Sequence, residues 1–157
     1  MREPSAVPER SAEPIKKMIQ PPALNRKKVL VVDDEQPICD MLRLALERCG
    51  YTVFIANGAQ DALAIMDSQK CPVMLLDFSL PDMDGMDLFK RIKAEHPDSI
   101  GFLLTGWASE EDLIACNAAG FTHCFTKPVS LVRLFESVQQ AFESPPVSPC
   151  RTLTGSR

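Results

Sequence analysis

The chain has 157 residues, of which 45% are hydrophobic, and a formal net charge of −4 at pH 7. These values fit one globular domain with a substantial core. The acidic balance excludes a basic nucleic-acid footprint, and no apolar run is long enough to predict a membrane span or a signal peptide. We therefore expect a cytoplasmic protein that binds neither nucleic acid nor membrane.

Six cysteines are present, and none forms a C-x-x-C pair. Most of them lie in apolar runs, where cysteine behaves as a small hydrophobic residue. Because the chain is neither short nor evidently secreted, we expect free thiols rather than a disulfide framework.

Proline is concentrated at the two ends, where eight of the thirteen prolines lie. Residues 1–26 form a Pro-rich extension and residues 144–157 a polar tail, and neither buries enough apolar surface to offset chain entropy. We predict that both ends are disordered and that residues 27–143 form the folded domain. The tails are either docking segments or solvated linkers, and their composition favours linkers.

The first half of this domain alternates strands with helices. The expected order is a strand over Val29–Val32, a helix over Pro37–Cys49, a strand over Val53–Ile55, a helix over Ala59–Met66 and a strand over Val73–Leu76. Proline suits the first turn of the first helix, and the glycine after it suits its carboxyl-terminal cap. Helical spacing places one apolar face on that helix, formed by Ile38, Met41, Leu42, Ala45 and Cys49.

The second half repeats the pattern. A helix over Met86–Ala94 is expected to bury Leu88, Phe89 and Ile92, and a strand follows over Ile100–Leu104. The next helix begins at Ser109, with Asp112 completing a variant capping box, and ends at Gly120. A strand over Cys124–Thr126 then leads to a last helix, capped by Ser130, with an apolar stripe of Leu131, Leu134, Phe135, Val138 and Phe142.

Continuously apolar strands separated by helices predict a parallel sheet covered on both faces. With right-handed crossovers, five strands and five helices give a doubly wound α/β fold.

Polar residues follow these strands at their carboxyl ends. Asp33 and Asp34 follow the first strand and Asp77 the third, while Thr105 and Lys127 close the fourth and fifth. Open parallel sheets bind ligands at this edge, so we expect the side chains to share one crevice. Crowded carboxylates favour a cation, and Mg²⁺ prefers oxygen ligands together with a phosphate. Taken singly, an Asp-Asp pair is more often a turn or a helix cap, and the lysine or threonine is as often an ordinary loop residue as a site residue.

Asp77 has the position of a nucleophile that could accept a phosphoryl group as an acyl phosphate. Asp82 and Asp84 lie in a tight turn after it and are interpreted as turn or cap residues rather than ligands.

These motifs together resemble the receiver domain of bacterial response regulators. The resemblance covers about Lys27 to Phe142 and rests on VVDDE at 31–35, LLD at 75–77, LPDMDG at 80–85, LLTG at 103–106 and TKP at 126–128. It implies a flavodoxin-like (βα)5 sheet with strand order 2-1-3-4-5. It also implies a stand-alone regulator rather than an enzyme. Its own chemistry would be limited to self-phosphorylation from small donors and to autodephosphorylation.

The resemblance implies roles for the crevice residues. Asp77 would be the phosphoacceptor, and the donor would be a sensor histidine kinase or a phosphotransfer (Hpt) protein. Asp34 and Asp77 would bind Mg²⁺ directly, with Asp33 acting through water and the Ser79 carbonyl as a further ligand. Lys127 would contact the phosphoryl group, and Thr105 would move toward it.

One position departs from the family pattern. Receivers carry Tyr or Phe three residues before the lysine, and this chain has Cys124 there. Phe125 is one position off, so it should point to the opposite face of its strand and join the core. Switching is therefore hypothesised to involve a rearrangement of Trp107. The alternative is that Trp107 is a core residue. Trp107 and Ser79 also hold the positions that tune dephosphorylation in this family, and the bulk of the tryptophan predicts a long-lived phosphoryl state.

Two other readings remain. An aspartate-based phosphatase needs a second acid two residues after its nucleophile, and Ser79 stands there instead. A phosphate-independent adaptor is kept open by Cys124. No output domain is expected after the last helix, so the signal would pass by docking to an unidentified downstream protein, and the resemblance leaves open a homodimer formed on phosphorylation.

Overall fold

The computed structural model describes residues 27–106 and 109–143. The two predicted disordered ends and Trp107 lie outside these residues. Within them, strands and helices alternate along the chain as β1 (Lys28–Val32), α3 (Gln36–Arg48), β2 (Thr52–Ala56), α4 (Ala59–Gln69), β3 (Val73–Asp77), α5 (Gly85–Glu95), β4 (Ile100–Thr105), α6 (Glu110–Ala118), β5 (His123–Thr126) and α7 (Leu131–Glu143).

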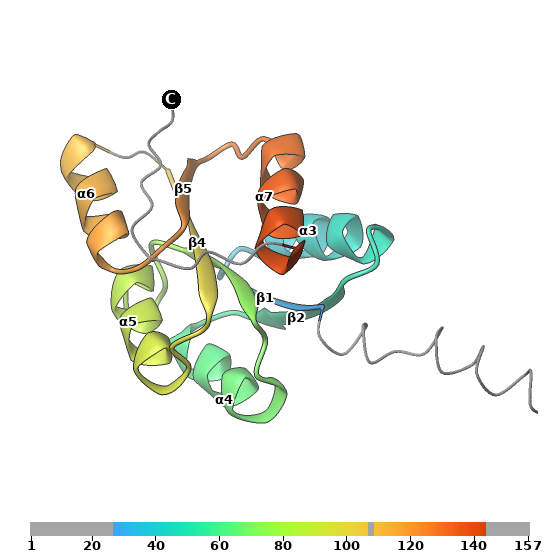
Figure 1. Ribbon diagram of the computed structural model, residues 1–157, viewed down its shortest axis with the longest axis horizontal. Coiled ribbons are helices and arrows are strands. Elements are labelled where there is room, and N and C mark those ends of the chain that lie inside the picture. Colours follow the sequence, from blue (N-terminus) through green and yellow to red (C-terminus); the bar gives the residue numbers. More distant parts are fainter. Residues whose placement is uncertain (1–26, 107–108, 144–157) are drawn as a thin grey trace, which may run out of the picture.

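The five strands form one parallel sheet in the order β2-β1-β3-β4-β5. This is the predicted doubly wound arrangement, with β1 and β3 at the centre (Figure 1). Consecutive parallel strands need crossover connections, and each of these is provided by a helix. The carboxyl ends of β1, β3, β4 and β5 therefore lie along one edge of the sheet.

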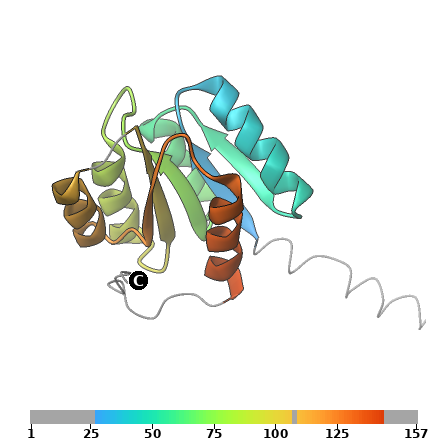
Figure 2. The same ribbon diagram turned by 90° about the horizontal axis from the view of Figure 1, so that it is seen from above.

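Helices cover both faces of the sheet, with α3 and α7 on one side and α4, α5 and α6 on the other (Figures 1 and 2). Alternation along β1 supplies both cores. Leu30 and Val32 pack toward α4, α5 and α6, while Val29 and Val31 pack toward α3 and α7. All four are fully buried, which is why the strand reads as a continuous apolar run.

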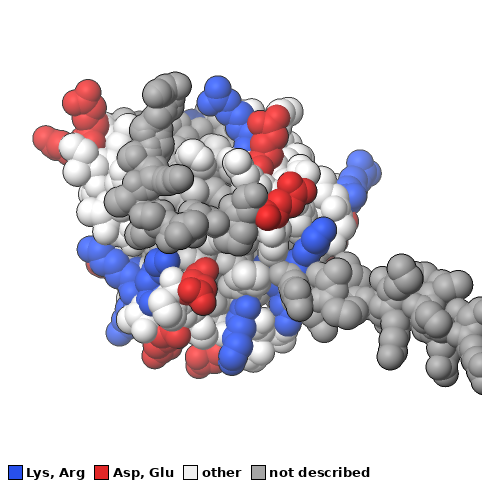
Figure 3. Space-filling view, in the orientation of Figure 1, with Lys and Arg blue, Asp and Glu red and all other residues white. Residues whose placement is uncertain are grey.

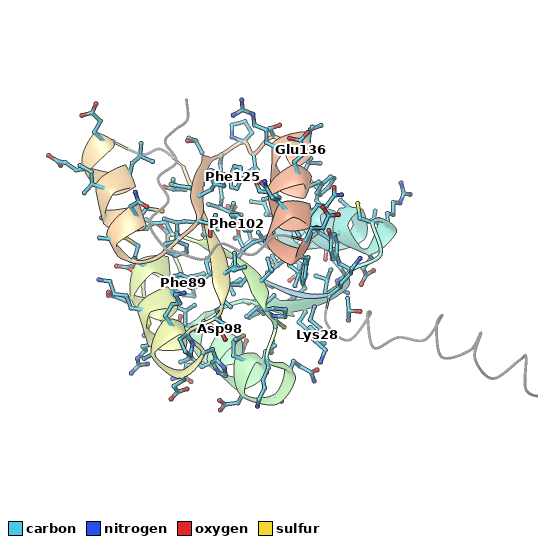
Figure 4. The ribbon with its side chains drawn as sticks, in the orientation of Figure 1. Lys28, Phe89, Asp98, Phe102, Phe125 and Glu136 are labelled. Carbon is cyan, nitrogen blue, oxygen red and sulfur yellow. The ribbon has the colours of Figure 1, made fainter. Side chains whose placement is uncertain are left out.

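Aromatic residues pack in the cores on both faces of the sheet. Phe89 on α5 stacks on Phe121 with ring centroids 4.3 Å apart, and Phe102 on β4 packs against Phe125 on β5 at 6.0 Å (Figure 4). Gly101 faces the Phe89 ring so closely that a Cβ would meet it at 2.6 Å. The glycine in β4 therefore lets α5 approach the sheet.

Several local predictions are confirmed. Ser109 and Asp112 form a reciprocal capping box at the start of α6. Gly50 and Gly120 follow α3 and α6 with φ of +96° and +97°, a conformation that glycine adopts without steric cost. The buried residues of α5 are the expected Leu88, Phe89 and Ile92, together with Gly85.

The predicted face of α3 is partly wrong. Its buried residues are Cys39, Leu42 and Leu46, whereas Met41 and Cys49 are exposed. Both stripes have helical spacing, and only the packing against the sheet decides between them. Helix α3 also spans Gln36–Arg48 rather than Pro37–Cys49, and α4 continues to Gln69, where Lys70 ends it in a left-handed conformation.

Among the described residues, charged side chains of both signs are mixed over the face shown in Figure 3. None of the helices within residues 27–106 and 109–143 is long and apolar enough to cross a membrane.

A carboxylate and lysine site at the sheet edge

Three aspartates meet at the carboxyl edge of the central strands. Asp33 and Asp34 follow β1 directly, and Asp77 is the last residue of β3. One carboxylate oxygen from each lies within 4.8 Å of the others. Asp33 and Asp77 are buried, whereas Asp34 is exposed to solvent. We call Asp33, Asp34, Asp77 and Lys127 the acidic crevice.

Lys127 reaches this cluster from the end of β5. Its backbone N–H donates to the Thr105 carbonyl at 2.7 Å, which continues the pairing of β4 with β5 by one residue. From there its Nζ lies 2.9 Å from Asp77 Oδ1 and 3.3 Å from Asp33 Oδ2. The sheet register thus brings together residues that are 94 positions apart in the chain.

Burial and charge perturb both partners. Burial raises the pKa of Asp77 above its usual value, and the charges of Asp33 and Asp34 raise it further, while Lys127 opposes this rise. Burial on its own would lower the pKa of Lys127, but its hydrogen bonds and charge contacts with Asp77 and Asp33 outweigh burial and raise it. The charged form of Lys127 is therefore favoured, whereas the charged form of the buried Asp77 carboxyl is disfavoured.

Asp33 also organises the local backbone. Its Oδ1 accepts a hydrogen bond from the Glu35 N–H at 2.9 Å, as in an Asx turn. Its carbonyl oxygen accepts from the Asn57 side chain at 3.1 Å and from the Cys39 thiol at 3.2 Å. The turn interpretation of the Asp-Asp pair is therefore confirmed for Asp33, and the same residue contributes a carboxylate to the acidic crevice.

Asp82 and Asp84 are helix caps, as interpreted. Asp84 accepts from the Asp87 N–H at the start of α5. Asp82 reaches a different helix and accepts from the N–H groups of Ala59 and Gln60 at 2.9 and 3.1 Å. These hydrogen bonds lower the pKa of Asp82. The cap ties the loop after Asp77 to α4, a partnership that sequence spacing does not indicate.

Gly85 is a further residue that the sequence reading did not single out for function. A Cβ at this position would collide with the backbone carbonyl of Asp77, and the Gly85 N–H donates to the Phe78 carbonyl at 2.8 Å. The loop that follows Asp77 therefore folds back onto its own strand only because residue 85 has no side chain. The glycine that ends the LPDMDG motif was the available signal.

A cavity of about 330 Å³ opens beside the acidic crevice, between β4, β5 and α6. We call it the β4–β5 cavity. Its lining includes Ser79, Met86, Leu103, Thr105, Asp112 and Cys124. Ser79, the predicted backbone ligand of the metal, and Thr105, the predicted phosphate-contacting residue, thus both line this cavity.

Cys124 and Phe125 point to opposite faces of β5, as predicted. Cys124 packs toward α4, α5 and α6, whereas Phe125 packs toward α3 and α7. The aromatic ring therefore lies outside the β4–β5 cavity and belongs to the opposite core.

The acidic crevice suits a hard divalent cation. Three carboxylates face one ammonium group, which leaves an excess of negative charge and several unshared oxygen ligands. Mg²⁺ is bound in proteins by one or two carboxylates with several waters retained. The donor set of Asp33, Asp34 and Asp77 fits that ion.

Comparison with known proteins identifies the class. Residues 29–139 match the family model of the response regulator receiver domain, and the chain belongs to this family. Its domain is thus a receiver of two-component signalling, a class that generally signals rather than acts as a classical enzyme.

Two relatives are similar to this chain in sequence. The chain is 37% identical over 116 residues to an uncharacterized 14.6 kDa protein in the sodA1 3' region of Leptolyngbya boryana, covering 71% of this chain and 87% of that protein. It is 38% identical over 103 residues to the probable transcriptional regulatory protein TcrX of Mycobacterium tuberculosis, covering 66% of this chain and 44% of TcrX.

Solved structures share the fold. A CheY-like receiver domain from Methanospirillum hungatei has a TM-score of 0.72 and 32% identity, covering 76% of this chain and 95% of that one. The beryllofluoride-activated NtrC4 receiver domain dimer has the same TM-score at 33% identity, covering 76% and 99% of the two chains.

Proposed function

We propose that this protein is a stand-alone response regulator that accepts a phosphoryl group on Asp77 from a sensor histidine kinase or a phosphotransfer protein. The contact between Lys127 Nζ and Asp77 Oδ1 carries the proposal. This ion pair places a cation beside the carboxylate at the end of β3, where it can contact the phosphoryl group once Asp77 carries one.

Three residues have separate roles in the proposed phosphoryl transfer. An Asp77 oxygen attacks the phosphorus atom, the bond from phosphorus to the donor breaks, and the electron pair leaves with the donor group. Lys127 then contacts a phosphoryl oxygen with the ammonium that faces Asp77 at rest. Asp33 holds Lys127 from the other side at 3.3 Å, so the lysine stays in place when Asp77 is modified.

The metal ligands would be Asp34 and Asp77 directly, Asp33 through water, and the Ser79 carbonyl. Bound Mg²⁺ supplies charge neutralisation for the phosphoryl oxygens and for the crowded carboxylates. The excess of acidic oxygens in the crevice supports this ligand set.

The signal would leave through Thr105 and the neighbouring loop to an unidentified downstream protein. Phosphorylation acts here as a local change of charge that biases a two-state element. Cys124 leaves the usual aromatic partner absent from the β4–β5 cavity, so the proposed moving residue is Trp107. Trp107 also holds a position that tunes dephosphorylation in this family, so its bulk predicts slow dephosphorylation, and Trp107→Ala should shorten the lifetime of the phosphoryl state.

The testing experiment is phosphorylation of the purified full chain with acetyl phosphate and Mg²⁺, followed by intact mass. Wild type should gain one phosphate, and Asp77→Asn should gain none. Asp84→Asn is the matched control, because Asp84 is an exposed cap in the same loop. It should be phosphorylated like wild type.

A folded wild type that gains no phosphate from acetyl phosphate or from a histidine kinase would reject the proposal. It would favour the phosphate-independent adaptor instead. Size-exclusion chromatography of the phosphorylated sample tests the homodimer, which would elute earlier than the unmodified chain.

A further inference from the structure

A second cluster of metal-ligating side chains lies between the ends of α4 and α5. It contains Asp67 from the last turn of α4, Glu95 at the end of α5, and His96, which caps α5. One ligand atom from each residue lies within 4.8 Å of the other two. We call these three residues the α4–α5 cluster. Two carboxylates and one imidazole give it a mixed set of oxygen and nitrogen donors.

The cluster lies at the opposite edge of the sheet from the acidic crevice. Each crossover helix returns the chain from the carboxyl end of one strand to the amino end of the next, so α4 and α5 end at the amino edge. The two helices contact each other on one face (Figure 1). Met66, beside Asp67, is buried in the same core as Ile92, whose carbonyl accepts from the His96 N–H at 2.7 Å. Core packing therefore fixes the backbone on both sides of the cluster.

The cluster gathers negative charge where the helices already carry it. A helix dipole is negative at its carboxyl end, so a carboxylate in the last turn is disfavoured there and a cation is favoured. Lys70 Nζ donates to the Asp67 carbonyl at 3.2 Å, and Lys93 Nζ donates to a loop carbonyl, that of Pro97, at 2.8 Å. In the part of the chain that the structure describes, the carboxylates of Asp67 and Glu95 form no salt bridge. A bound cation would supply the balancing charge.

The donor set favours a transition metal over Mg²⁺. Imidazole nitrogen suits Zn²⁺, whereas Mg²⁺ takes oxygen ligands. Zn²⁺ binds nitrogen and oxygen at about 2.0–2.2 Å, which separates the ligand atoms of a tetrahedral site by about 3.4 Å. Asp67 and Glu95 are exposed, so their side chains can rotate to close the remaining distance without moving the helices. The acidic crevice, by contrast, offers carboxylates alone.

We propose that Asp67, Glu95 and His96 form a Zn²⁺ site that joins the carboxyl ends of α4 and α5. Each residue provides one ligand atom, and water completes a tetrahedral coordination sphere. The bound ion stabilises the packing of the two helices, because it binds the folded chain and not the unfolded one. The site does not depend on the proposed phosphoacceptor function, since the two clusters share no residue.

The experiment follows the histidine rings of the ¹⁵N-labelled full chain by NMR while Zn²⁺ is added in the presence of excess Mg²⁺. The chain has two histidines, and His96→Gln assigns their signals. We expect the His96 ring signals to change and to saturate at one equivalent of Zn²⁺. Those of His123, which stacks on Phe102 away from the cluster, should stay in place. A His96 ring that is unchanged in a large excess of Zn²⁺ would overturn the proposal.

Variants separate a built site from a lone surface histidine. Asp67→Asn and Glu95→Gln should each weaken Zn²⁺ binding at least about tenfold, since even outer-shell partners of metal ligands contribute about 10–100-fold. Asp98→Asn is the matched control, because it removes an exposed carboxylate near His96 that lies outside the cluster, and it should bind like wild type.

Two results with the variants would overturn the proposal. Wild-type affinity in both Asp67→Asn and Glu95→Gln would show that the histidine binds the ion alone. Loss of the His96 response in Asp34→Asn would place the ion in the acidic crevice. Circular dichroism checks that each variant is folded, and the wild-type titration remains decisive if one is not.

Discussion

The acidic crevice and the β4–β5 cavity lie side by side at one sheet edge, yet they are built differently. In the crevice three charged groups hold one another in place: Lys127 contacts Asp33 and Asp77, and Asp33 also accepts from the Glu35 N–H. In the cavity, about 330 Å³ is unfilled, and a thiol stands where the family carries an aromatic ring. The contrast suggests that the chemistry of the crevice constrains its residues closely, while the neighbouring cavity tolerates replacement.

The largest expected effect comes from Gly85, which lets the loop after Asp77 fold back. Gly85→Ala places a Cβ against the Asp77 carbonyl, so we expect a loss of about 3 kcal/mol or more in the free energy of unfolding. Urea denaturation measures it. Gly106→Ala is the control, since a Cβ there meets nothing within 4 Å, and it should be near neutral. Equal losses in both variants would show that the close approach at Gly85 is not the cause.

The next effect comes from Lys127, whose ammonium balances two buried carboxylates. Breaking a buried ion pair costs roughly 3–5 kcal/mol, and the 22% exposure of the Lys127 side chain reduces this to about 2 kcal/mol for Lys127→Met. Added Mg²⁺ should restore much of the loss by replacing the missing positive charge. Lys90→Met on the exposed side of α5 should change stability little and show no such rescue. A Lys127→Met protein as stable as wild type without Mg²⁺ would contradict the pairing.

Asp77→Asn should stabilise the protein at neutral pH when no divalent cation is present. The pKa of Asp77 is raised in the folded state, so the folded protein binds more protons than the unfolded one as pH rises above 3.8, and stability falls through that window. Asparagine removes this cost, by on the order of 1 kcal/mol. The difference from wild type should vanish below about pH 3.8 and reverse when Mg²⁺ is added at neutral pH. Urea midpoints across pH, with Asp84→Asn as a near-neutral control, test the sign.

The smallest effect is expected in the β4–β5 cavity. Cys124→Tyr introduces an aromatic ring at the family's usual position, and the unfilled volume should accept it within about 0.5 kcal/mol. Cys71→Tyr, in a fully buried site, should instead cost about 2–3 kcal/mol through overpacking. A Cys124→Tyr protein destabilised as much as Cys71→Tyr would show that the cavity is closed in solution.

The sequence predicted the fold and the composition of the crevice because both depend on strand ends. Once β1, β3, β4 and β5 are recognised as parallel, their carboxyl ends must meet, and Asp33, Asp77 and Lys127 follow. The faces of β5 also followed from simple alternation, as Cys124 and Phe125 illustrate.

Other features depend on packing that spacing does not encode. Met41 and Leu46 have equally good helical spacing on α3, and only contact with the sheet buries the second. The cap that Asp82 places on α4 joins residues of different elements. It has no local signal in the chain, and Trp107 lies outside the described residues.

The most direct test of the central claim locates the phosphoryl group. The protein is phosphorylated with acetyl phosphate and Mg²⁺ and then reduced with borohydride, which converts an aspartyl phosphate into homoserine at the modified position. Peptide mapping should find homoserine at position 77. Homoserine at position 33 or 34 with an unmodified Asp77 would contradict the account, since Lys127 would then serve a different acceptor.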